Sequence, residues 1–212
     1  QSYIKRILNA QVYDVARETP LDAAPLLSAR LGNQAFLKRE DLQPVFSFKC
    51  RGAFNKMVHL DEAARAGGVV AASAGNHAQG VALAASKLGI KATIVMPVTT
   101  PLIKVDAVKA LGAKVVMHGD SFDEAAVRAR ALTESEGFTF IHPFDDPDVI
   151  AGQGTVAVEL VRQAQQPLDY VFVCCGGGGL LAGMAAYLRY VWPQTRIIGV
   201  EPEDAACVQA AL

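Results

Sequence analysis

The segment SFKCRG places a lysine at the predicted start of a helix. Ser47 is a favourable N-cap, and the apolar residues that follow recur at helical spacing, so Lys49 is expected in the first turn. The positive end of a helix disfavours an ammonium group and so lowers the lysine pKa. A neutral lysine amine is a nucleophile toward carbonyl carbons. Taken alone, however, Lys49 is better explained as a solvated surface lysine, which is the usual state of this residue.

Four consecutive glycines follow an apolar strand pattern and precede a helical pattern in the segment CCGGGGLLAG. Gly176, Gly177, Gly178 and Gly179 remove every Cβ from this turn, so backbone N–H groups can converge on an anion at the helix start. A P-loop is excluded because no Lys-Ser or Lys-Thr pair follows, and GxGxxG is excluded because Leu181 replaces its third glycine. A plain turn needs only one or two glycines, so phosphate binding is favoured.

A second loop of this kind is SAGNHAQG, which also follows a strand pattern and enters a helix. Ser73, Asn76 and the amides around Gly75 suit a carboxylate, although simple capping of the helix explains them equally well. His77 is expected to form a hydrogen bond or to pack, since no carboxylate partner is apparent. A neutral lysine together with a phosphate site would hold a phosphorylated carbonyl compound, of which pyridoxal phosphate is one.

The elements that position these loops alternate between short β-branched runs and helical patterns. This alternation predicts an α/β fold with two open, mostly parallel, doubly wound lobes and right-handed crossovers. The turn-rich segment HPFDDPD is the expected boundary, and ligands bind beyond the carboxyl ends of such strands. The predicted strands are 35–38, 68–73, 92–97, 114–119, 138–141, 170–175 and 196–201, and the clearest helices are 76–88, 100–111, 121–136, 149–162 and 180–190.

Composition narrows the possible functions of the 212 residues. A net charge of −1 and the absence of charge runs argue against nucleic-acid binding. No apolar stretch is long enough to span a bilayer, and the first 20 residues do not resemble a secretory signal. The four cysteines form no CxxC motif, which favours a reducing compartment, the cytoplasm, and predicts that Cys174 and Cys175 are buried free thiols. The four histidines are scattered, so the sequence gives no support for zinc.

The ordered set SFKCRG, SAGNHAQG and GGGGL resembles the fold-type II pyridoxal-phosphate enzymes, related to the tryptophan synthase β chain. Within them, the sequence is most similar to the biosynthetic threonine dehydratases, also called threonine deaminases. The resemblance also includes KREDLQPVFSFKCRGAF, VMPVTTPLIKVDAVKALGA, HPFDDPDVIAGQGT and VEPEDAACV, and so covers nearly the whole chain.

The resemblance implies a role for each loop. Lys49 matches the Schiff-base lysine, whose released amine removes the Cα proton, and Asn76 matches the residue that hydrogen-bonds the phenolic oxygen of the cofactor. The implied cofactor-binding residues are Phe48, Lys49, Asn76, Gly176, Gly177, Gly178, Gly179 and Leu180. The implied substrate-binding residues are Ser73, Ala74, Gly75, Asn76 and His77.

The implied reaction is pyridoxal-phosphate dependent β-elimination in isoleucine biosynthesis. It converts L-threonine to 2-oxobutanoate and ammonia, and L-serine to pyruvate. Related serine racemases have a serine acid/base where this chain has Ala74, so elimination without racemisation is expected. Cation-dependent relatives have a second carboxylate where this chain has Cys207, and Glu201 alone gives little support for a metal, so none is expected.

The resemblance also implies how the chain is organised. We expect residues 1–44 to pack on the large lobe, 45–148 to form the small lobe and 149–212 to be the first part of the large cofactor-binding lobe. The large lobe would then be an incomplete sheet with an exposed edge, with weak or absent activity on its own and with self-association. In the family, the complete enzyme is expected to be a homo-oligomer, a dimer or a tetramer.

Three alternatives to a threonine dehydratase remain open at this point. One is an L-serine dehydratase with the same cofactor, because the extra methyl group of threonine changes specificity only modestly. Another is a noncatalytic remnant that binds pyridoxal phosphate or a partner protein. The third, a nicotinamide-dependent oxidoreductase, requires a GxGxxG motif and a ribose-binding acid about 20 residues further on, and the tetraglycine provides neither cleanly.

Overall fold

A computed structural model describes residues 2–212, whose strands form three separate sheets. The largest is a four-stranded parallel sheet in the order β5-β4-β3-β6. A parallel pair joins β7 to β8, and an antiparallel pair joins β1 to β2. The strands are β1 (Leu21–Ala23), β2 (Phe36–Lys38), β3 (Val69–Ala72), β4 (Ala92–Met96), β5 (Lys114–Met117), β6 (Thr139–Phe140), β7 (Tyr170–Cys174) and β8 (Arg196–Val200).

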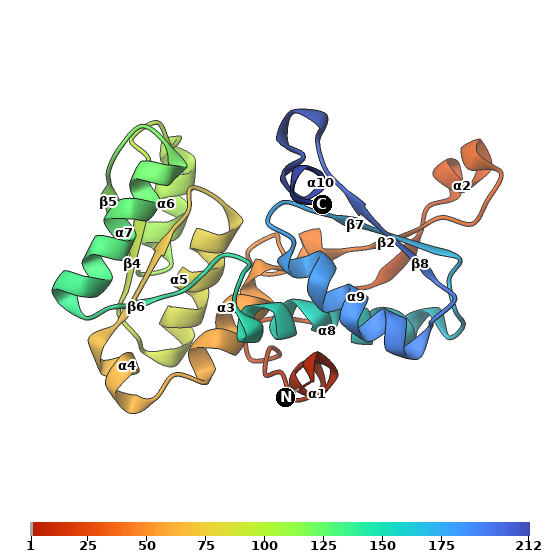
Figure 1. Ribbon diagram of the computed structural model, residues 1–212, viewed down its shortest axis with the longest axis horizontal. Helices are drawn as coiled ribbons and strands as arrows, with labels where there is room; N and C mark the ends of the chain where they lie inside the picture. Colours follow the sequence, from red (N-terminus) through yellow and green to blue (C-terminus); the bar gives the residue numbers. More distant parts are fainter. Residues whose placement is uncertain (1) are drawn as a thin grey trace.

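Helices cover both faces of the four-stranded sheet, because side chains alternate between the faces of each strand. Val69 and Ala71 pack in one core with residues of α3 (Lys49–Val58) and α5 (Asn76–Leu88), whereas Val70 and Ala72 face α7 (Phe122–Glu136). Figure 1 shows α6 (Leu102–Ala110) and α4 (Glu62–Gly67) around the same sheet. The predicted doubly wound α/β architecture is therefore confirmed.

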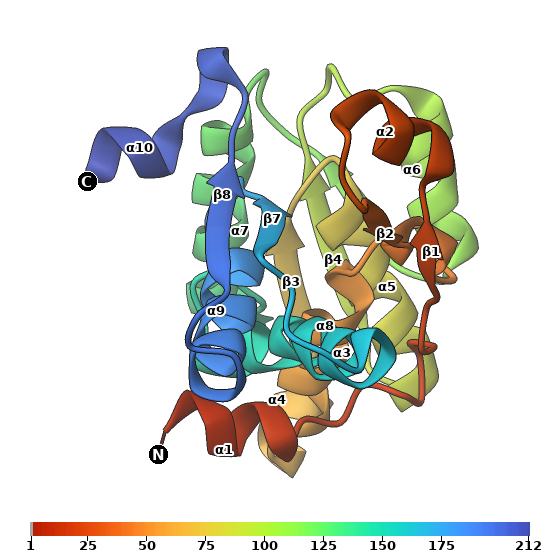
Figure 2. The same cartoon turned by 90° about the vertical axis from the view of Figure 1, so that its right-hand side faces the viewer.

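A second group of elements surrounds β7 and β8 (Figures 1 and 2). The long helix α8 (Pro147–Ala164) and α9 (Gly179–Val191) pack together and bury one face of β7. The other face leaves Tyr170 and Phe172 exposed. The remaining helices are α1 (Tyr3–Leu8), η1 (Glu40–Leu42), η2 (Glu203–Ala205), α10 (Cys207–Ala211) and α2 (Pro25–Leu31), which projects from the body. No helix within residues 2–212 is long and apolar enough to cross a membrane.

The sequence predicts the main elements well and the short ones poorly. Each of the seven predicted strands is present, and α5 has the predicted bounds. The strand β1 and the helices α1, α2, α4 and α10 were missed, because three to seven residues carry too little periodicity. The expected N-cap at Ser47 is wrong: Phe48 is the N-cap of α3, and Ser47 lies one residue earlier.

Helix α3 is held closely between two neighbouring helices. A Cβ at Gly80 of α5 would lie 2.9 Å from the carbonyl oxygen of Lys49. On the other side, a Cβ at Gly152 of α8 would lie 2.7 Å from the carbonyl oxygen of Arg51. Real Cβ atoms do not approach backbone atoms this closely, so glycine is required at both contacts. The backbone that carries Lys49 is thereby fixed from both sides.

We predict that Gly80→Ala lowers the free energy of unfolding by about 1 to 3 kcal/mol, because the added methyl group must push two helix backbones apart. Ser86→Ala, at an exposed position of the same helix, is the control and should change stability by less than about 0.5 kcal/mol. Urea unfolding followed by circular dichroism measures both. Equal stability of the two variants would contradict the close contact.

Candidate functional site

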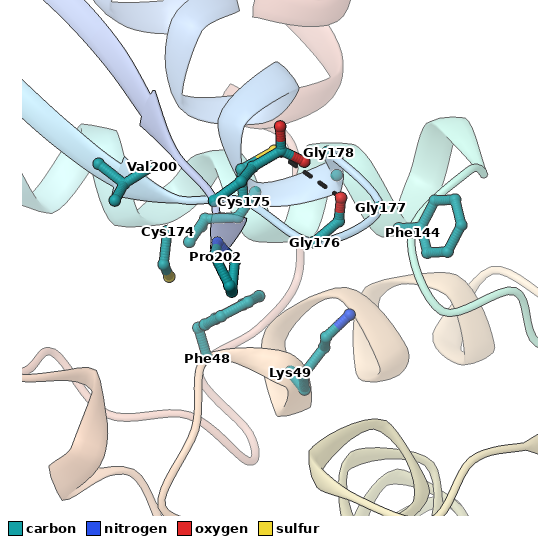
Figure 3. A pocket seen from close by; sticks show the side chains of 13 residues that line it. Phe48, Lys49, Phe144, Cys174, Cys175, Gly176, Gly177, Gly178, Val200 and Pro202 are labelled. Atoms are coloured by element: carbon teal, nitrogen blue, oxygen red, sulfur yellow. Dashed lines mark hydrogen bonds between the residues drawn. The ribbon is translucent and has the colours of Figure 1, made fainter. Parts of the chain in front are cut away.

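A cavity of about 530 Å³ lies between the start of α3 and the start of α9. Figure 3 shows Lys49 on one side of it and the glycine turn on the other, with Phe144 beside the turn. The structure thus brings together two of the three predicted loops. The lining residues are Phe48, Lys49, Phe144, Cys174, Cys175, Gly176, Gly177, Gly178, Gly179, Leu180, Val200, Glu201 and Pro202.

Lys49 is the first residue of α3 and so lies in its first turn, as the sequence predicts. Its backbone N–H donates to Ser47 Oγ at 3.3 Å, so Ser47 supports the helix start without being its N-cap. Its Nζ donates to the carbonyl oxygen of Pro143 at 2.6 Å and lies 5.6 Å from the centroid of the Phe48 ring. Burial lowers the pKa of Lys49 to about 8, although the nearby Cys174 thiol acts in the opposite direction. The direction agrees with the prediction, but its cause is burial and not, as expected from the sequence, the positive end of the helix.

The glycine turn precedes α9, whose N-cap Gly178 has φ +85° and makes no side-chain cap within residues 2–212. The first amides of this helix therefore remain free to bind an anion. A Cβ at Gly177 would overlap the Phe144 ring, and one at Gly179 would lie 2.8 Å from the Phe144 carbonyl oxygen. Packing against Phe144 thus accounts for two of the four glycines, while Gly176 has open space around its Cβ position.

The sequence indicates the loop that carries Phe144 as a boundary turn and as part of the family resemblance, but not as part of the site. It reaches both ends of the cavity, since Pro143 accepts the bond from Lys49 and Phe144 packs on the glycine turn. His142 Nδ1 accepts the backbone N–H of Phe144 at 3.2 Å and of Asp145 at 2.7 Å. The His142 and Phe144 rings also pack edge to face, with their centroids 4.7 Å apart. The segment HPFDDPD is therefore part of the site. An aromatic residue, Phe144, within a turn-rich loop was the feature of the sequence that could have indicated this.

The third predicted loop lies at the start of α5 and does not line the cavity. Ser73 Oγ accepts the N–H of Gly75 at 3.2 Å, while Ala74 is half-buried and Asn76 is exposed. Helix α5 has no side-chain cap within residues 2–212, so its first amides are also available to an anion. The first turns of α5 pack on the start of α3, since a Cβ at Gly80 would lie 2.9 Å from the Lys49 carbonyl oxygen.

His77 is a buried, neutral residue. Burial lowers its pKa to about 3, with the Lys49 charge acting in the same direction. Its Nε2 is 2.9 Å from the carbonyl oxygen of Ile141 and must carry the proton to make that hydrogen bond. The prediction that His77 forms a hydrogen bond rather than acting as a base agrees with this geometry.

Two further predictions concern the residues around β7 and β8. Cys174 and Cys175 are free thiols, but only Cys175 is buried. Cys174 is exposed because consecutive side chains of a strand point to opposite faces, so the expected burial of both was wrong. Glu201 uses its carboxylate to accept the backbone N–H groups of Val208 and Gln209, each at 2.9 Å.

Comparison with known proteins is consistent with this geometry. A model of the family described as "Pyridoxal-phosphate dependent enzyme" matches residues 12–212. The chain is 60% identical to a chloroplastic biosynthetic threonine dehydratase of Arabidopsis thaliana and 53% identical to the biosynthetic L-threonine dehydratase of Escherichia coli. Each match covers 99% of this chain but only 36% and 41%, respectively, of the relative.

Solved structures show the same fold. A processed threonine deaminase isoform of Solanum lycopersicum is 55% identical, with a TM-score of 0.92 over 94% of this chain and 55% of that one. A maize serine racemase is 36% identical, with a TM-score of 0.93 over 99% of this chain and 65% of that one.

We predict that Gly177→Ala lowers the free energy of unfolding by about 1 to 3 kcal/mol, because its methyl group must displace the Phe144 ring. Gly176→Ala, one residue earlier and with open space at its Cβ position, should change stability by less than about 0.5 kcal/mol. Thermal unfolding of the two variants in parallel is the measurement. A Gly176→Ala protein as destabilised as Gly177→Ala would contradict the packing described here.

Proposed function

This chain belongs to the pyridoxal-phosphate dependent enzyme family, and on that premise we propose that its protein is a threonine ammonia-lyase. The reaction removes the β-hydroxyl and amino groups of L-threonine and yields 2-oxobutanoate and ammonia, with L-serine as a second substrate that yields pyruvate. The observation that carries the proposal is the buried Lys49 amine, which faces the glycine turn across one cavity. The high identity to threonine dehydratases supports this choice of substrate.

The residues around the cavity fit pyridoxal phosphate on two observations. The amides at the start of α9 carry no side-chain cap within residues 2–212, and an anion is the partner that such a helix start favours. Lys49 offers a desolvated amine on the opposite side. We propose that the backbone amides of residues 176–180 bind the phosphate group and that Lys49 bonds covalently to the carbonyl carbon of the cofactor. Phe48 is proposed to lie beside the cofactor ring. Asn76 is proposed to donate to the ring oxygen.

The chain's own residues supply binding and proton transfer in this proposal. When bound, pyridoxal phosphate serves as the electron sink for negative charge at the substrate Cα. When it is free of the cofactor, the neutral amine of Lys49 accepts the Cα proton, which its lowered pKa permits near neutral pH. The first amides of α5, in the loop from Ser73 to His77, bind the substrate carboxylate. His77 stays neutral and holds this loop against Ile141.

Ala74 is the basis for distinguishing elimination from racemisation. A methyl group neither donates nor accepts a proton, so this residue cannot deliver one to Cα. Racemisation needs a proton donor on the face opposite the base, and Lys49 serves only one face. We therefore propose that the reaction proceeds to the oxo acid without formation of the D-amino acid.

We predict that Lys49→Ala lowers the turnover of L-threonine by at least about 1,000-fold, because one residue supplies both the cofactor attachment and the base. The assay follows 2-oxobutanoate formation with pyridoxal phosphate present, and the far-ultraviolet circular dichroism spectrum serves as the folding control. The same samples with L-serine should contain pyruvate but no D-serine. Native turnover in the Lys49→Ala protein would exclude the mechanism, and rapid D-serine formation would exclude the role given to Ala74.

The lowered pKa gives a second prediction, made for the protein without cofactor. Only the neutral amine reacts with an acylating reagent, so acylation of Lys49 should rise with pH to a midpoint near 8, below the ordinary lysine value of 10.5. Peptide mapping after brief acetic anhydride treatment from pH 6 to about 11 measures the profile. Urea-unfolded protein is the control, and its Lys49 should titrate at the ordinary value. A folded-state midpoint equal to the unfolded one would contradict the burial of the amine.

A further inference from the structure

A buried cluster of charges surrounds Arg51, two residues after Lys49. The Arg51 side chain has no exposed surface and forms two bidentate ion pairs. Its Nη1 and Nη2 donate to Glu159 at 2.6 and 3.0 Å, and its Nε and Nη2 donate to Glu40, each at 2.8 Å. Nη1 also donates to Thr155 Oγ1 at 3.1 Å, and Nη2 to the Arg17 carbonyl oxygen at 3.2 Å. The planar fork of a guanidinium is thus fully used.

The charges in this cluster balance. Lys38 Nζ donates to Glu159 Oε2, the oxygen that also accepts from Arg51 Nη2, at 2.6 Å. The two cations, Arg51 and Lys38, thus face the two carboxylates of Glu40 and Glu159. Burial alone would raise the pKa of Glu159, but the hydrogen bonds and charges of Arg51 and Lys38 hold it below the usual value. Glu159 therefore stays ionised although its side chain has no exposed surface.

The cluster connects α3, the helix that carries Lys49, with α8, the helix that packs on α9. Arg51 belongs to the first turn of α3, and Glu159 belongs to α8. Helix α8 in turn packs tightly on α9, where a Cβ at Gly154 would lie 3.1 Å from the carbonyl oxygen of Gly183. A continuous path of backbone contacts and ion pairs thus runs from the first turn of α3 through α8 to Gly183 of α9. None of the charged residues in the cluster lines the cavity.

We propose that Arg51 and Glu159 are positioning residues, whose ion pair sets the place of the Lys49 amine relative to the glycine turn. This inference rests on the proposed attachment of pyridoxal phosphate to Lys49. Lysine in place of Arg51 would keep the charge but could not form two bidentate pairs, so the first turn of α3 would no longer be held in one position. The cluster would then be required for the geometry of the site as well as for stability.

The test uses three variants, each of which is expected to disturb the cluster less than the one before: Arg51→Lys, Glu159→Gln and Thr155→Val. The control is Glu18→Gln. It removes the exposed ion-pair partner of Arg162, which lies on α8 as Glu159 does. For each folded protein, well below its melting temperature, absorbance titration gives the Kd for pyridoxal phosphate. Borohydride reduction and peptide mapping then give the share of bound pyridoxyl groups on Lys49. Near-ultraviolet circular dichroism shows whether the variant retains its native packing.

We expect Arg51→Lys and Glu159→Gln to raise the Kd for pyridoxal phosphate by about tenfold or more and to spread the label to other lysines. Thr155→Val should show a smaller change in the same direction, and Glu18→Gln should show none. If Arg51→Lys does not fold, the other two variants decide the question. Natively packed Glu159→Gln and Thr155→Val proteins with the unaltered Kd and label position would overturn the positioning role.

The unaltered protein separates this inference from the function on which it rests. If its Lys49 takes no label, the proposed function is wrong, and the positioning role is overturned with it. If its Lys49 is labelled and the variants behave identically, only the positioning role is wrong.

Discussion

A fully buried guanidinium between two carboxylates is the interaction on which the arrangement of the cavity depends. Arg51 ties the first turn of α3 to Glu159 on α8 and to Glu40 near the N-terminal strands. Removing one partner of such a pair leaves the other charge buried, which costs about 3 to 5 kcal/mol. Because of this cost, the cluster is stable only when both the guanidinium and its carboxylate partners are in place. The ion pair therefore opposes movement of α3 relative to α8, the two helices that it joins.

The same burial that makes Lys49 reactive also makes it dependent on its surroundings. Desolvation favours the neutral amine, yet a buried amine still needs a hydrogen-bond acceptor. The Pro143 carbonyl provides one, in a loop braced by His142 and packed on Gly177 through Phe144. The one loop between β6 and α8 thus contacts both Lys49 and the glycine turn. The position of this loop links the two halves of the site, although neither half is near it in sequence.

Local patterns in the sequence predict what depends on local interactions. The bounds of α5 are found correctly because Gly75 and Gly89 mark both of its ends, and Lys49 is placed correctly because it lies at a helix start. Contacts between distant segments are different. Glu159 lies 108 residues after Arg51, and nothing in either neighbourhood indicates that they pair. The role of Phe144 is not predicted either, because its contacts with Gly177 and Gly179 join segments that are distant in the sequence.

The most direct measurement is a crystal structure of the protein soaked with pyridoxal phosphate. The account predicts density for the phosphate group on the backbone amides of residues 176–180 and continuous density from the cofactor to Lys49 Nζ. The hydrogen bond from Lys49 to the Pro143 carbonyl should then be broken, while the Arg51–Glu159 pair stays unchanged. Phosphate bound away from the glycine turn, or an unmodified Lys49 still bonded to Pro143, would contradict the account.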